Sequence, residues 1–270
     1  MELNYLVKEV IEIARAAGTI IMQVYNEYQD IQIQEKSDKS PLTIADQKSN
    51  EIIVAGLNQL AINYPIVSEE NKTIPYEERV KFNRFWMVDP LDGTKEFIKR
   101  NGEFTVNIAL IDNGIPILGV VYAPALDLMY WAVKEIGAYK VVQEEDVGIF
   151  ASHFSAVDTA LRIVCSRSHM NEETKAFVGQ LAKPVLVPTG SSLKIVYLAE
   201  GKADIYPRLG PTMEWDIAAA QIILEEAGGS VKEAEKLQNM TYNKENMLNP
   251  YFVAYGQGDI SSLFLPEISE

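Results

Sequence analysis

The chain opens with two stretches in which apolar residues recur every three or four positions. Residues 3–24 follow this spacing closely, which predicts an amphipathic helix with one buried stripe. Residues 43–60 return to it and end before Pro65, so a second helix is expected there. Between them, residues 31–42 alternate apolar and polar positions and then become charged. That pattern is typical of a short hairpin or flap.

From residue 65 onward the pattern changes to short apolar runs, which are typical of strands. The segment PIVSEEN predicts a short strand, and the runs FWMVD, TVNIALID, PILGVVYAP and LMYWAV follow, separated by turn-forming residues. We expect these runs to form an antiparallel sheet.

The second half of the chain has a different organisation. Residues 142–160 are polar and weakly patterned, so we place a boundary between two lobes there. Beyond it strands and helices alternate, with helices expected near 171–182, 191–201 and 216–227. The sequence therefore predicts an α+β lobe over residues 1–150 and an α/β lobe over residues 151–270.

Composition narrows the class of protein. The 270 residues contain no apolar run long enough to span a bilayer, and acidic residues near the start are unlike a secretory signal. The single cysteine, Cys165, lies in an apolar run, so we interpret it as a core residue rather than a catalytic thiol. We expect a soluble, cytoplasmic protein.

The formal net charge of −14 argues against a nucleic-acid partner, which would require a basic surface. Such a charge can simply confer solubility. If the carboxylates converge on one cleft, however, they can hold hard divalent cations.

The segment WMVDPLDGTKEF is the strongest candidate for such a cleft. Asp89 ends an apolar strand, and Asp92 precedes the Gly93-Thr94 pair at a predicted helix start, where backbone amides attract phosphate. Two aspartates would repel that phosphate, and a divalent cation held by Asp89, Asp92 and the Leu91 carbonyl resolves the conflict. Mg²⁺ is the natural candidate. The alternative is an ordinary Asp-Gly turn in which Asp92 caps the helix.

Further carboxylates come from other segments. Glu69 and Glu70 end the strand PIVSEE, Asp216 opens the predicted helix at 216–227, and Asp46 lies early in the helix at 43–60. Each has a structural alternative. The Glu-Glu pair can be surface charge, Asp216 an N-cap, and Asp46 a first-turn acid favoured by the helix dipole.

Taken together, these motifs resemble a known family. The segments SEE at 68–70, DPLDGT at 89–94 and WDIAAA at 215–220 resemble the inositol monophosphatase superfamily of Mg²⁺-dependent, lithium-sensitive phosphatases. Within it, DPLDGTKEF, GSSLK at 190–194 and YPRLGP at 206–211 are similar to the bacterial 3′(2′),5′-bisphosphate nucleotidases of the CysQ type. The pair Lys95-Glu96 is the strongest indication of a nucleotidase, since inositol monophosphatases usually carry Thr-Asn after the same Asp-Gly-Thr. The resemblance implies a layered α/β/α/β/α sandwich.

The resemblance also implies roles for the carboxylates. Glu69, Asp89 and the Leu91 carbonyl would hold one Mg²⁺, and Asp89, Asp92 and Asp216 a second, while a third near Glu69 occurs in this superfamily. Gly93 and Thr94 would cradle the scissile phosphate. The catalytic residues would be Glu69, Asp46 and Thr94, whose hydroxyl, oriented by Asp46, would help to deprotonate the attacking water. No histidine base is then required.

Substrate recognition would come from the second lobe. Ser191, Lys194, Arg208 and His169 match positions that contact the nucleoside or its 5′-phosphate in the nucleotidases, and Asp216 adjoins them. Alone, His169 could be a loop histidine, and Ser191 and Lys194 a helix cap followed by a solvated lysine. The flap residues Lys36, Asp38 and Ser40 align too loosely to be assigned.

The expected activity is removal of the 3′-phosphate from adenosine 3′,5′-bisphosphate, with 3′-phosphoadenylyl sulfate as a further substrate, in a monomer or weak homodimer. The bacterial family also associates peripherally with the inner membrane, although no amphipathic anchor supports this here. Two alternatives remain open. One is an inositol- or sugar-phosphate phosphatase on the same scaffold, and the other is a non-catalytic acidic protein that binds Mg²⁺ or Ca²⁺.

Overall fold

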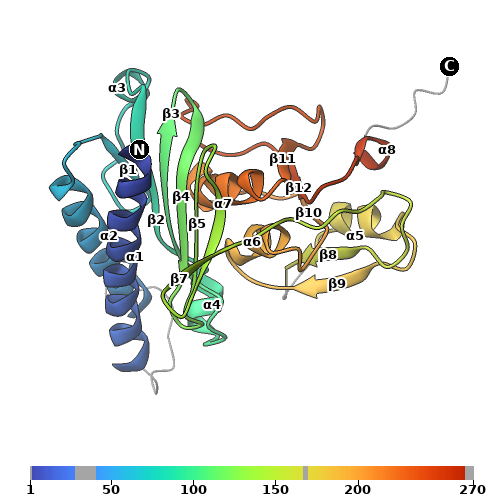
Figure 1. The fold of residues 1–270 in the computed structure, drawn as a ribbon, viewed down its shortest axis with the longest axis horizontal. Helices are drawn as coiled ribbons and strands as arrows, with labels where there is room; N and C mark the ends of the chain where they lie inside the picture. Colours follow the sequence, from blue (N-terminus) through green and yellow to red (C-terminus); the bar gives the residue numbers. More distant parts are fainter. Residues whose placement is uncertain (1, 28–40, 167–169, 265–270) are drawn as a thin grey trace.

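A computed structural model describes residues 2–27, 41–166 and 170–264 (Figure 1). His169 and the flap residues Lys36, Asp38 and Ser40 lie outside these ranges. The helices are α1 (Glu2–Glu27), α2 (Pro41–Gln59), α3 (Tyr76–Arg79), α4 (Thr94–Ile98), α5 (Glu172–Gly179), α6 (Leu193–Ala199), α7 (Glu214–Glu226) and α8 (Ser261–Phe264). No helix in the described part of the chain has both the length and the apolar character that a membrane span requires.

The first sheet has seven strands in the order in which they occur in the chain. They are β1 (Ile66–Ser68), β2 (Arg84–Asp92), β3 (Thr105–Asp112), β4 (Ile115–Ala123), β5 (Leu128–Val133), β6 (Gly137–Val142) and β7 (Glu145–Gly148). The predicted antiparallel pairing of β2 to β5 is confirmed, while β1 pairs with β2 in parallel.

Strand β7 was not predicted, because it falls in the stretch taken as a polar linker. All four of its residues are exposed at the edge of the sheet, so they carry no alternating pattern. Polar contacts hold it instead. Asp146 pairs with Lys8 of α1 and accepts a hydrogen bond from Trp131 Nε1 (2.7 Å), and Glu144, directly before the strand, pairs with Arg15 (3.1 Å).

The second sheet has the strand order β11-β12-β10-β8-β9 and is mixed. Its strands are β8 (Arg162–Cys165), β9 (Val185–Pro188), β10 (Ile205–Arg208), β11 (Ser230–Glu233) and β12 (Phe252–Tyr255). Strand β11 was not predicted. The two sheets separate between residues 149 and 161, where the sequence places the lobe boundary, and the division into two lobes stays a prediction.

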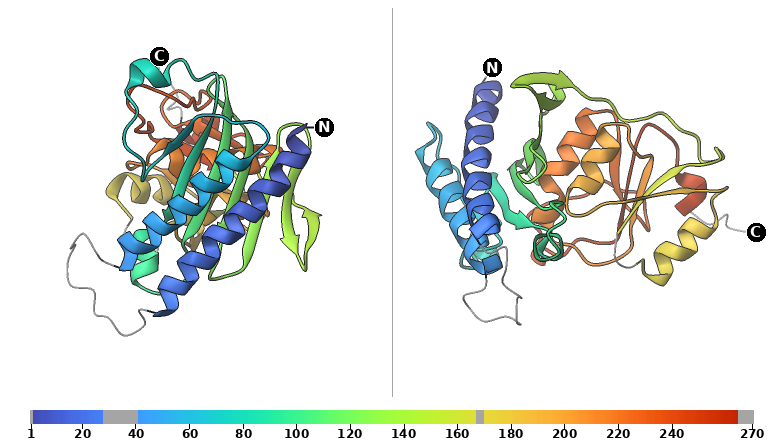
Figure 2. Two further views of the ribbon diagram at one scale, coloured as in Figure 1. Left: turned by 90° about the vertical axis from the view of Figure 1, so that its left-hand side faces the viewer. Right: turned by 90° about the horizontal axis from the view of Figure 1, so that it is seen from below.

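The elements stack in five layers, as Figure 2 shows from two further sides. Helices α1 and α2 cover one face of the first sheet, α6 and α7 lie between the two sheets, and α5 covers the outer face of the second sheet. Alternation along β2 produces this arrangement. Trp86 and Val88 face α1 and α2, whereas Phe85 and Met87 pack toward α7. The predicted layered α+β fold is confirmed.

Helix α7 lies very close to the first sheet because β4 carries a glycine at the contact. A Cβ on Gly119 would lie 2.4 Å from the carbonyl oxygen of Ala219, so even alanine would push the helix away. The buried helix brings its first turn to the edge of the sheet at which β1 ends.

Candidate active site

Glu69 and Asp89 lie side by side directly after the last residue pair of the parallel strands β1 and β2. Ser68 of β1 pairs with Val88 of β2, and the Glu69 amide donates a hydrogen bond to the Val88 carbonyl (3.2 Å). Parallel neighbours end at the same edge of a sheet, so the next residue of each strand reaches that edge. Asp89 is 1% exposed, whereas Glu69 is exposed.

A break in the pairing of β2 with β3 separates Asp89 from Asp92 along the strand. The register with β3 shifts between these two residues, where Pro90 has no amide to donate. The Leu91 amide donates to Asp89 Oδ1 (3.1 Å), and the hydroxyl of Ser49 in α2 donates to the Pro90 carbonyl (2.8 Å). The bulge is therefore fixed by hydrogen bonds at both ends.

Asp216 reaches the same place from the other half of the chain. It is the third residue of α7, and its carboxylate accepts a hydrogen bond from the amide of the N-cap residue Met213 (2.9 Å). The alternative that Asp216 itself is the N-cap is therefore wrong. Its carbonyl accepts a hydrogen bond from the Ser192 hydroxyl (2.6 Å), which ties α7 to the loop before α6.

Three carboxylates thus converge. One oxygen each of Glu69, Asp89 and Asp216 lies within 4.8 Å of the other two. Burial, followed by repulsion from Asp92, Glu69 and Asp216, holds the pKa of Asp89 well above its usual range. Burial and like charges also raise the pKa of Glu69 and of Asp216 to about 7 each. Three mutually repelling oxygen ligands fit a hard divalent cation.

Asp92 borders this group and is held by the GSSLK segment. Its Oδ2 accepts hydrogen bonds from Ser191 (2.6 Å) and Ser192 (3.2 Å). The alternative that Asp92 caps α4 is wrong, because Gly93 is the N-cap and has no side chain. Asp92 is the largest charge contribution to the raised pKa of both Asp89 and Asp216. It therefore adds a fourth carboxylate beside the three.

Sequence reasoning missed the residues that support this contact. Thr105 of β3 lies 2.5 Å from the Ser191 hydroxyl, and Asn107 Nδ2 donates to the Ser192 hydroxyl (2.9 Å). Both are fully or almost fully buried. Their signal is visible in the sequence, because they are two polar residues spaced two apart in a strand that is otherwise apolar before Asp112, and so face the same side.

Asp46 lies opposite the acidic pair at 69–70. Helix α2 begins at Pro41, five residues earlier, so the first-turn alternative is wrong. Burial, and then the charges of Glu70 and Glu69, raise the pKa of Asp46 to about 8, and its Oδ1 is buried with no hydrogen-bond partner among the described residues. Within the same ranges no hydrogen bond joins it to Thr94, so the proposed orientation of that hydroxyl stays a prediction.

Gly93 occupies a position that only glycine suits. Its φ of 102° is left-handed, and a Cβ there would lie 3.1 Å from the Cα of Phe104 and 3.2 Å from the Glu103 carbonyl oxygen. The absence of a side chain leaves the backbone at the start of α4 open to close approach. Thr94 follows it and is exposed.

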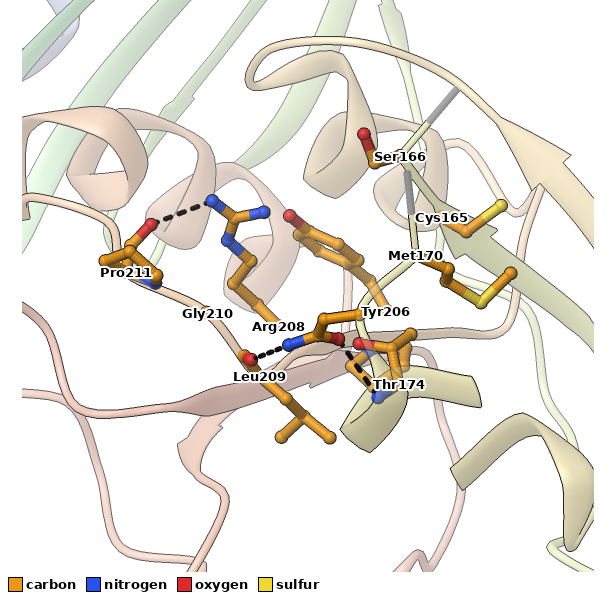
Figure 3. A pocket seen from close by; sticks show the side chains of 11 residues that line it. Cys165, Ser166, Met170, Thr174, Tyr206, Arg208, Leu209, Gly210 and Pro211 are labelled. Atoms are coloured by element: carbon orange, nitrogen blue, oxygen red, sulfur yellow. Dashed lines mark hydrogen bonds between the residues drawn. The ribbon is translucent and has the colours of Figure 1, made fainter. Parts of the chain in front are cut away.

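One pocket lies beside the carboxylates, and a second pocket adjoins it. The first is lined by Asp92, Asp216, Lys194 and Arg208, among others, so anionic and cationic side chains share one hollow. The second lies beyond Arg208 and Tyr206 and runs along β10 to Cys165 and Thr174 (Figure 3).

The predicted substrate residues have defined contacts at these pockets. Ser191 is not a helix cap, since its hydroxyl donates to Asp92 and Ser192 occupies the N-cap position of α6. Lys194 Nζ donates to the Ser191 carbonyl (3.0 Å), and Arg208 Nη2 donates to the Pro211 carbonyl (2.8 Å). Arg208 Nε is buried and has no partner among the described residues.

The fold and the acidic site define a class of protein. The chain belongs to the inositol monophosphatase family, whose model matches residues 2–257, and this family is metal-dependent. The resemblance of the motifs is thereby confirmed.

Particular relatives lie within this class. The 3′(2′),5′-bisphosphate nucleotidase CysQ of Shigella flexneri is 43% identical over 253 residues, which cover 92% of this chain and 98% of the relative. The CysQ of Escherichia coli K12 has the same identity and coverage. The crystal structure of CysQ from Bacteroides thetaiotaomicron has a TM-score of 0.84 and 41% identity, and covers 94% of this chain and 98% of that one.

Proposed function

We propose that this chain is a 3′(2′),5′-bisphosphate nucleotidase that removes the 3′-phosphate from adenosine 3′,5′-bisphosphate and releases AMP. The observation that carries the proposal is the convergence of Glu69, Asp89 and Asp216 beside a pocket that also contains Lys194 and Arg208. The carboxylates fit a cation that receives the scissile phosphate, and the two basic side chains fit a second phosphate. Similarity to CysQ enzymes over most of the chain supports the same substrate.

We further infer that the cation is Mg²⁺ and that two ions bind. Glu69, Asp89 and the Leu91 carbonyl would hold one, and Asp89, Asp92 and Asp216 the other. A third near Glu69 stays a prediction. When bound, Mg²⁺ neutralises charge on the phosphate and lowers the pKa of water.

The chain's own residues have separate tasks in this scheme. Gly93 and Thr94 let the phosphate approach the backbone at the start of α4. The Thr94 hydroxyl, oriented by Asp46, orients the attacking water and relays its proton to the Asp46 carboxylate. Water forms a new bond to phosphorus while the bond to the ribose 3′-oxygen breaks, and that oxygen takes up a proton from solvent. Ser191 and Ser192 keep Asp92 in place during the reaction.

The proposal extends to a second substrate and to the role and location of the enzyme in the cell. We infer that 3′-phosphoadenylyl sulfate is a further substrate, because its 5′ group is also an anion that Lys194 and Arg208 can bind. A role in sulfur assimilation and a cytoplasmic location follow from the same proposal.

The proposed activity is tested by comparing phosphate release from adenosine 3′,5′-bisphosphate and from inositol 1-phosphate, each with Mg²⁺ and with EDTA. We expect Mg²⁺-dependent release, inhibited by Li⁺, with a strong preference for the nucleotide. A preference for inositol 1-phosphate would instead favour an inositol phosphatase. Metal binding without release from either ester would favour a non-catalytic metal-binding protein.

Replacing Lys194 with methionine is expected to weaken recognition of the second phosphate. A hydrogen bond to a charged group contributes about 1.5–3 kcal/mol, so kcat/KM for adenosine 3′,5′-bisphosphate should fall roughly 10- to 100-fold. Adenosine 3′-monophosphate lacks the 5′-phosphate, and its kcat/KM should change little. Lys202→Met is the matched control, since Lys202 pairs with Glu200 away from the pocket. An equal loss with both nucleotides would contradict the assignment of Lys194.

A further inference from the structure

A buried cation and a buried anion lie on opposite sides of segment 243–245. Arg79, at the end of α3, is 3% exposed, and Glu214, at the start of α7, is fully buried. The Arg79 guanidinium donates hydrogen bonds to Asn243 Oδ1 (2.6 Å) and to the carbonyls of Lys244 (3.1 Å) and Glu245 (3.2 Å). The Glu214 carboxylate accepts hydrogen bonds from the amides of Asn243 (2.6 Å) and Lys244 (3.0 Å).

Segment 243–245 therefore directs hydrogen-bond acceptors toward Arg79 and backbone amides toward Glu214. Two further hydrogen bonds join the segment to the same two residues. Asn243 Nδ2 donates to the Arg79 carbonyl (2.7 Å), and Lys244 Nζ donates to the Glu214 carboxylate (2.6 Å). Buried charges are stable only when they are hydrogen-bonded, so each side chain fixes the segment and, through it, the position of the other.

Both side chains are connected to metal-site carboxylates from different halves of the chain. Glu214 lies two residues before Asp216, in the first turn of the same helix. Arg79 ends the segment that starts directly after Glu69, and its Nε donates to the Ile74 carbonyl within that segment (3.3 Å). Glu69, Arg79 and Trp215 line one common pocket together with Met247, which lies two residues beyond segment 243–245.

We propose that Arg79 and Glu214 are positioning residues for the metal centre: by holding segment 243–245 between them, they set the separation of the Glu69 and Asp216 carboxylates. The inference rests on the proposed metal site. Like charges push these carboxylates apart when no cation is bound, and a rigid connection between their segments keeps them ready to bind one.

The test is Mn²⁺ binding to the whole chain, measured by titration calorimetry and by electron paramagnetic resonance of free Mn²⁺. Replacing a residue that holds a metal ligand in place typically weakens metal binding by about 10- to 100-fold. We therefore expect Arg79→Met and Glu214→Gln each to weaken Mn²⁺ binding by a factor of that size. The milder variant Asn243→Gly removes both side-chain bonds to Arg79 and suits the left-handed φ of 69° at that position. It keeps both amide bonds to Glu214, so we expect a smaller weakening.

The matched control is Asp204→Asn. Asp204 is 5% exposed and pairs with Arg162 in the second sheet, at 2.5 Å, and lines none of the pockets beside the carboxylates. We expect this variant to lose thermal stability and to bind Mn²⁺ as the wild type does.

The possible results of these measurements distinguish a failure of this inference from a failure of the proposed function. Wild-type affinity for Mn²⁺ in folded Asn243→Gly and in the two charge variants, despite lower thermal stability, would overturn the inference alone. An equal loss of affinity in Asp204→Asn would also overturn it, because general destabilisation would then explain the effect. If the wild-type chain binds no Mn²⁺, the proposed metal site fails, and the inference fails with it.

Discussion

Asp89→Asn is expected to lower the turnover of adenosine 3′,5′-bisphosphate by roughly 10³-fold or more, while the metal-free protein becomes more stable. The carboxylate is buried among other acids, so its charge is unfavourable until a cation binds. Asparagine keeps the oxygen that accepts the Leu91 amide and removes the charge. Losing a metal ligand costs several kcal/mol of transition-state stabilisation, and each 1.36 kcal/mol is tenfold in rate.

Steady-state kinetics with Mg²⁺ and thermal unfolding in EDTA test the two halves of this prediction. Asp204→Asn is the control with the opposite pattern, since Asp204 is a buried aspartate paired with Arg162. That variant should lose stability and keep its activity. An active, Mg²⁺-dependent Asp89→Asn enzyme would refute the assignment of Asp89 as a ligand.

Without metal, the protein is expected to lose stability as the pH rises from about 4 to about 8. The pKa of Asp46 is raised from 3.8 to about 8, and those of Glu69 and Asp216 to about 7. The folded state therefore retains protons that the unfolded chain releases above pH 4. Stability from these groups is fully present below their ordinary pKa values and is lost as the pH passes their raised ones.

Melting temperatures in EDTA across this range provide the measurement. Asp204 and Glu200 have lowered pKa values and act in the opposite sense, but their contribution changes only at acid pH, near and below about 4. Saturating Mg²⁺ should restore stability at pH 8, because the cation replaces the protons. Asp89→Asn should flatten the pH dependence in EDTA. A melting temperature in EDTA that rises between pH 5 and pH 8 would contradict the close approach of these carboxylates.

Much of the fold follows from local patterns in the sequence. Helix α1 and strands β2 to β5 have long, regular apolar spacings, because each buries one face or both against a large core. The edge strand β7 and the short strand β11 bury too little for such a pattern to develop. Their pairing partners, rather than their own residues, determine their structure.

Only some residues of the candidate site could likewise be predicted from the sequence. Glu69, Asp89 and Asp216 are visible because each ends a strand or begins a helix at a recognisable motif, and the structure brings them together. Arg79 and Glu214 were not predicted, since in sequence they resemble ordinary surface charge. Their burial depends on segment 243–245, which lies far along the chain and has no regular pattern.

The proposed site requires carboxylates from both halves of the chain to share bound metal. A crystal grown with Mn²⁺ and inorganic phosphate, with data recorded at the manganese absorption edge, shows whether they do. We predict anomalous peaks within ligand distance of Glu69, Asp89 and Asp216, with phosphate between the metal and Gly93. Peaks only at other acidic groups, or no peak at these three at saturating Mn²⁺, would show that these carboxylates do not share a metal ion.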